Sequence, residues 1–164
     1  MSKKRIKSTT LGALALLAMA LCAQAAFGAE QTRETYTAQV EPICKVNREA
    51  NERILKSVKS EVKAGKLKVA AGQFTQAAKA LKKTLAQLRA VPQPSADKAK
   101  LGKWLGYIGE EARLFESTAA KLRAGNKAGA QSMTVKLTHT ANLANVQVLA
   151  FEFNYCQVNP SQFT

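Results

Sequence analysis

Few residues in this chain could carry chemistry, and their spacing matches no catalytic or cofactor motif. His139 is the only histidine, and a general base or haem ligand would need a partner side chain that the sequence does not place beside it. The adjacent residues Glu110 and Glu111 point in different directions around a helix, and the Glu-x-x-His motif of di-metal helical bundles does not occur. We therefore expect a protein that is not an enzyme and that holds no cofactor and no metal.

The cysteines indicate a disulfide. Three occur, and the first, Cys22, falls in an N-terminal segment that we expect to be removed. In an exported protein the remaining pair, Cys44 and Cys156, is typical of a disulfide. A metal site would lack ligands, because there is one histidine and no cysteine lies near either of these two. We expect a bridge that closes a loop of about 110 residues, with two free thiols as the alternative.

Residues 1–25 have the three parts of a secretory signal peptide. Basic side chains are concentrated in residues 3–7, and the apolar run that follows, residues 11–22, is too short to span a bilayer. The small residues of Ala23-Gln24-Ala25 then predict cleavage before Ala26. We therefore expect export to the periplasm or the cell wall space.

Cleavage at this site leaves one domain, residues 26–164, which is long enough for a hydrophobic core. It removes four of the 25 basic residues and none of the 11 acidic ones, so the mature net charge is +10. Three alternatives remain for the N-terminus: cleavage after Ala29, a lipid anchor on Cys22, and an uncleaved membrane anchor.

Hydrophobic periodicity predicts four helices and no strand. Gly65 and Gly125 each follow an alanine at a position where a helix C-terminus favours a left-handed residue, so the first two and the last two helices should be antiparallel neighbours. A stiff connector, residues 91–95, joins the two hairpins, and Ser95 caps the third helix. Pro42 either kinks the first helix or marks its first turn. The expected architecture is all-α, an up-down-up-down four-helix bundle of two αα-hairpins closed by the disulfide, with helices at about 32–64, 66–90, 96–124 and 127–153.

The two ends of the chain carry a resemblance. The segment Tyr36-Thr37-Ala38-Gln39-Val40-Glu41-Pro42-Ile43-Cys44, together with Phe153-Asn154-Tyr155-Cys156, resembles a loose group of secreted helical proteins from actinobacteria. These pair an aromatic residue and a cysteine near the start with an aromatic-then-cysteine close. The resemblance implies export and one N-to-C-terminal disulfide, and it transfers no active site.

Positive charge is concentrated between residues 45 and 90, where twelve Lys and Arg face three Glu. One interpretation is a solvated face that keeps the protein soluble; the other is an anion-facing surface. Its partners would be anionic envelope polymers, lipid headgroups or acidic proteins. Nucleic acid is not expected, because aromatic residues do not alternate with these lysines as a stacking surface requires. The residues of this predicted basic face are Lys45, Arg48, Lys56, Lys59, Lys63, Lys79, Lys82, Lys83 and Arg89.

Gly102, Gly106 and Gly109 line one stripe of the third predicted helix, where glycine costs roughly 1 kcal/mol relative to alanine. A close helix–helix crossing explains them most simply. The alternative is a shallow ligand groove flanked by Trp104 and Tyr107.

Asparagines at core-facing positions predict a buried polar layer. Asn47 and Asn51 lie on or beside the apolar stripe of the first helix, and Asn142 and Asn145 lie at the matching edge of the fourth. Buried amides need partners, so we expect amides of the two helices to bond one another; the alternative is a wet boundary.

Taken together, these patterns favour a non-enzymatic extracytoplasmic binding module that acts through the basic face. A small-ligand carrier that uses the bundle interior or the glycine stripe is the alternative from another class, and a structural envelope protein is a third. Salt distinguishes the first two, because electrostatic binding weakens with ionic strength.

Overall fold

The computed structural model describes residues 30–159, and all regular structure in that range is helical. The predicted signal peptide and Cys22 lie outside the described residues. Two 3-10 turns, Ser95–Asp97 and Leu149–Phe151, accompany the α-helices. The α-helices are α1 (Arg33–Leu55), α2 (Val58–Lys63), α3 (Leu67–Ala90), α4 (Lys98–Arg123) and α5 (Lys127–Gln147).

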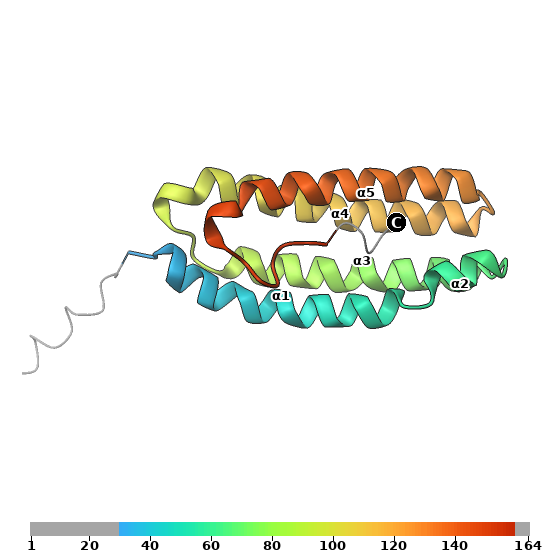
Figure 1. Ribbon diagram of the computed structural model, residues 1–164, viewed down its shortest axis with the longest axis horizontal. Coiled ribbons are helices and arrows are strands. Elements are labelled where there is room, and N and C mark those ends of the chain that lie inside the picture. The colour runs from blue at the N-terminus through green and yellow to red at the C-terminus, as the bar shows by residue number, and fades with distance from the viewer. Residues whose placement is uncertain (1–29, 160–164) are drawn as a thin grey trace, which may run out of the picture. The chain divides into compact units, whose positions relative to one another are not determined.

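Within residues 31–159 the long helices alternate in direction along the chain (Figure 1). α3 packs along α1 and α4, and α5 packs along α4, whereas α1 and α5 make at most marginal backbone contact. The line between α1 and α5 is therefore an open seam. None of the helices in this range combines the length and apolarity that crossing a bilayer requires.

The core contains a cluster of aromatic side chains where the C-terminal residues meet α1 and α4. Tyr36 meets Phe151 edge-on with ring centroids 5.7 Å apart, and Phe153 lies 5.6 Å from Trp104. Phe151 and Phe153 stack on each other at 5.2 Å. These contacts bury the large apolar surfaces that contribute most to core stability.

Both predicted left-handed turns are present. Gly65 and Gly125 have φ of +76° and +73°, a conformation that costs glycine little because it has no Cβ. Gly65 lies in the short turn between α2 and α3, and Gly125 lies in the short turn between α4 and α5.

An ion pair joins the start of α4 to the start of α1, because Arg33 donates to both carboxylate oxygens of Asp97 at 2.8 and 2.9 Å. This guanidinium holds the pKa of Asp97 below its usual value.

The first predicted helix, 32–64, is in fact two helices. α1 continues through Pro42 and ends at Leu55, and α2 starts at Val58. The break lies at Ser57, whose hydroxyl accepts a hydrogen bond from Gln73 Nε2 at 2.7 Å. Serine hydrogen-bonds readily to nearby groups outside a helix, and here a partner on α3 adds to that tendency.

The last predicted helix, 127–153, ends early, at Gln147. A 3-10 turn follows, and Glu152 then adopts the left-handed region with φ of +50°. Because the helix ends here, the chain can turn back toward α1, where Cys156 bonds to Cys44. The predicted disulfide is present: Cys44 and Cys156 are bonded at 2.02 Å, with Cα atoms 5.0 Å apart and a sequence separation of 112.

Candidate functional site

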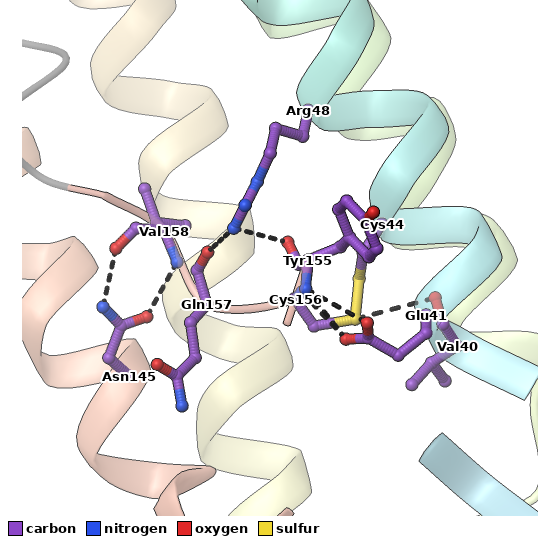
Figure 2. The surroundings of a disulfide bond; sticks show 9 residues. All are labelled: Val40, Glu41, Cys44, Arg48, Asn145, Tyr155, Cys156, Gln157 and Val158. Atoms are coloured by element: carbon purple, nitrogen blue, oxygen red, sulfur yellow. Dashed lines mark hydrogen bonds between the residues drawn. A yellow bond between two sulfur atoms is a disulfide. The ribbon is translucent and has the colours of Figure 1, made fainter. Parts of the chain in front are cut away.

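The seam between α1 and α5 is bridged at one end by the C-terminal segment, residues 153–159 (Figure 2). On the α1 side, the Glu41 carboxylate accepts hydrogen bonds from the backbone N–H groups of Tyr155 and Cys156 at 3.0 to 3.2 Å. Arg48 donates to the carbonyls of Tyr155 and Gln157 at 3.2 and 2.6 Å. The segment is therefore fixed to α1 by two charged side chains as well as by the disulfide.

On the α5 side, the Asn145 side chain donates to the Val158 carbonyl at 2.7 Å and accepts from the Val158 N–H at 2.9 Å (Figure 2). The predicted amide layer between the first and fourth helices is therefore wrong. Asn51 instead donates to Asn47 on its own helix at 3.3 Å, and Asn142 is exposed. The reason is that α1 and α5 do not pack together here. The side-chain amide of Asn145 on α5 bonds to the C-terminal segment instead.

A chamber of about 70 Å³ lies beneath this segment, with Asn51 of α1, Thr84 of α3 and Glu111 of α4 among its lining residues. Glu111 is 2% exposed, and its Oε1 atom has no hydrogen-bond partner among the described residues. Burial raises the pKa of Glu111 to about 8. The Oδ1 atom of Asn51 is likewise buried without a partner.

Glu111 was not singled out from the sequence, although a signal was present. It stands three residues after Ile108 and four before Phe115, the spacing that places a side chain on the core-facing stripe of a helix. Its neighbour Glu110 is half-buried and forms an ion pair with Arg113 at 2.8 Å. The two adjacent carboxylates do point in different directions, and only one of them enters the core.

A larger cleft of about 270 Å³ lies beyond the end of the seam, between α2, α4 and α5. Apolar side chains form much of its lining, and none of the described residues that line it is acidic. Three lysines border it: Lys59 and Lys63 from α2, and Lys127 from α5. The apolar lining residues are Leu55, Val58, Val62, Phe74, Leu122, Ala130 and Val135.

The break between α1 and α2 positions part of this cleft. α2 packs on α3 and buries none of its side chains completely. Its two valines, Val58 and Val62, are half-buried on the cleft side, while Lys59 and Lys63 are exposed. The arrangement places positive charge next to apolar surface that remains partly open to water.

The structure separates the predicted basic face into residues with different surroundings. Lys59 and Lys63 border the cleft. Arg48 donates hydrogen bonds to two backbone carbonyls, and Lys45 lies over the Tyr155 ring at 5.5 Å. Lys82 pairs with Glu116. The remaining members are exposed, one directly after α1 and three on α3, and none lines the cleft: Lys56, Lys79, Lys83 and Arg89.

Gly102 and Gly106 in the glycine stripe of α4 do not lie at a close helix–helix crossing. A Cβ added to Gly102 or Gly106 would meet no atom within 4 Å, and at Gly109 it would meet only Leu85, at an ordinary 3.4 Å. Trp104 is buried in the aromatic cluster and Tyr107 is half-buried. The two aromatic side chains therefore do not flank an open groove as a matched pair.

Two further observations bear on function. His139 is exposed on α5, and no group of three or more metal-ligating side chains occurs within residues 30–159. Comparison of the chain with protein-family models, curated proteins and solved structures found no match to any of them.

Proposed function

We propose that this chain is an extracytoplasmic binding protein for a small amphipathic anion, a molecule with an apolar chain and an anionic head group. The observation that carries the proposal is the apolar cleft bordered by Lys59, Lys63 and Lys127. The disulfide supports an oxidising, extracytoplasmic location, as does the N-terminal sequence of an exported protein.

The proposal joins the two functions that the sequence favoured separately. Two lysines of the basic face border an interior cleft, so one ligand would use both features. Apolar surface removed from water contributes roughly 25 cal/mol per Å², and the lysines favour the anionic end through charge attraction. A volume of about 270 Å³ is near the lower limit of ordinary ligand sites, which favours a short acyl chain.

We infer further that the fold is an up-down-up-down bundle opened along one side. The alternating helix directions in Figure 1 and the packing order α1–α3–α4–α5 support this topology. In a closed bundle α1 and α5 would also pack together. Here the C-terminal segment bridges the line between α1 and α5, and the cleft lies between α2, α4 and α5.

Calorimetric titration with hexanoate, octanoate and decanoate tests the proposal. One buried methylene contributes about 0.8 kcal/mol, so affinity should rise about fourfold for each carbon added until the cleft is full. Decanol, which has a similar chain and no charge, should bind more weakly than decanoate. If none of the three carboxylates binds, or if their affinities do not depend on chain length, the proposal is wrong.

A pair of double variants locates the site. Lys59→Gln with Lys63→Gln removes two charges at the cleft and should weaken decanoate binding about 3- to 10-fold, since exposed charge contacts contribute up to about 1 kcal/mol each. Lys79→Gln with Lys83→Gln removes the same charge from exposed positions on α3 and should change the affinity less than about twofold. Equal losses in the two variants would instead favour the alternative function, diffuse binding of anions over the basic face.

A further inference from the structure

The chamber beneath the C-terminal segment contains two buried acceptor atoms that lack donors. Glu111 Oε1 and Asn51 Oδ1 have no hydrogen-bond partner among the described residues, and both residues line the chamber. Buried polar atoms in proteins are nearly always paired. Two unpartnered oxygen atoms on residues that line one space favour a hydrogen-bond donor as the occupant of that space.

The charges around the chamber also favour a cation. Among its lining residues only Arg48 and Glu111 carry charge, and the Arg48 guanidinium already donates to two carbonyls of the C-terminal segment. The Oε1 atom of Glu111 has no hydrogen-bond partner among the described residues. An ionised carboxylate in this position is costly unless a positive group neutralises it.

We propose that the chamber is a binding site for the ammonium group of a small primary amine. The N–H donors would reach Glu111 and Asn51, and the positive charge would neutralise the carboxylate. Leu81, Leu88 and Ile108 complete the lining with apolar surface that suits a short alkyl group. The space of about 70 Å³ exceeds that needed for one water molecule.

Water and metal ions are less suitable occupants. A water molecule could bridge the two acceptors, but above pH 8, where Glu111 ionises, it would leave the carboxylate without a counter-ion. A divalent metal favours several oxygen ligands with more than one carboxylate among them, and Glu111 is the only carboxylate among the lining residues of the chamber. An ammonium group supplies N–H donors for both acceptors and one positive charge for the single carboxylate.

This site is distinct from the cleft of the proposed function. The two spaces share only Leu55 among their lining residues, and their charge preferences are opposite. The walls also differ in origin, because residues of the C-terminal segment line the chamber and are absent from the cleft lining. The two inferences can therefore fail independently.

Titration of the intact, oxidised protein with methylammonium chloride at pH 8.5 tests the site. We expect saturable binding in calorimetry, together with shifts of the Glu111 carboxyl carbon and the Asn51 side-chain amide in NMR spectra. Tetramethylammonium chloride carries the same charge without N–H donors and should produce neither effect. Binding should weaken as the pH falls below 8, because protonation of Glu111 removes the negative charge.

Two variants complete the test. Glu111→Gln should weaken methylammonium binding at least tenfold, whereas Glu110→Gln, a matched change at the adjacent position, should alter it less than twofold. Lys59→Gln with Lys63→Gln should leave it unchanged, which separates this site from the cleft. If the wild-type Glu111 and Asn51 signals do not move with methylammonium, the chamber holds only water and the proposal is wrong. Equal effects of the two glutamate variants would also overturn it.

Discussion

Replacement of Glu111 by Gln should remove most of the pH dependence of stability between pH 5 and pH 8. Glu111 is buried in the core-facing stripe of α4, and burial raises the pKa of its carboxyl from 4.5 to about 8. In the unfolded chain the same carboxyl ionises near its ordinary value. The folded protein therefore keeps a proton on Glu111 over a pH range in which the unfolded chain has lost it.

The sign and size of the effect follow from this difference. Stability falls with rising pH wherever the folded state binds more protons than the unfolded state. Glu111 should thus stabilise the fold fully below pH 4.5, and that contribution is lost as the pH rises toward 8. One pKa unit corresponds to about 1.36 kcal/mol, so the change from 4.5 to about 8 corresponds to roughly 4–5 kcal/mol over the whole range.

Urea unfolding of the oxidised protein at pH 5.5, 7.0 and 8.5 measures this directly. The wild type should lose about 3 kcal/mol across these conditions, and Glu111→Gln should lose less than about 1 kcal/mol, because Gln does not ionise. Glu110→Gln is the control: it changes the neighbouring residue, which is half-buried and ion-paired, and should keep the wild-type slope. If all three proteins lose the same free energy, the burial argument for Glu111 is refuted.

Four other perturbations test the architecture. Replacing Cys44 and Cys156 by Ser should lower the unfolding free energy by about 2–4 kcal/mol; an unchanged urea midpoint would mean that the remaining contacts of the C-terminal segment suffice. Asn145→Ala removes two hydrogen bonds to that segment and should cost about 1–2 kcal/mol while speeding its amide hydrogen exchange; unaltered exchange would contradict this. Gly106→Ala should stabilise by about 0.5–1 kcal/mol, because the added Cβ meets nothing within 4 Å. Gly125→Ala should destabilise, because φ there is +73°. If thermal unfolding shows that Gly106→Ala and Gly125→Ala shift the unfolding temperature in the same direction, this reasoning is wrong.

The binding spaces could not be located from the sequence, because their positions depend on how each helix is rotated and where it stops. The periodicity of α4 placed Ile108 and Phe115 in the core but did not single out Glu111, which lies between them. The grouping of Lys59 with Lys127 depends on the packing of helices that are distant in sequence. The split at Ser57 depends on its hydrogen-bond partner Gln73 on another helix.

What the sequence determined by itself was local, apart from the pairing of Cys44 with Cys156. Apolar spacing determined that the described chain is helical, and the conformational freedom of glycine determined the turns at Gly65 and Gly125. The pairing of Cys44 with Cys156 followed from the cysteine count and from the expected export of the chain. Only the tertiary structure decided that the chain would leave α5 at Gln147 and occupy the seam. The physical reason is that backbone groups of an irregular segment take whichever side-chain partners lie beside them in three dimensions, and sequence periodicity carries no information about those partners.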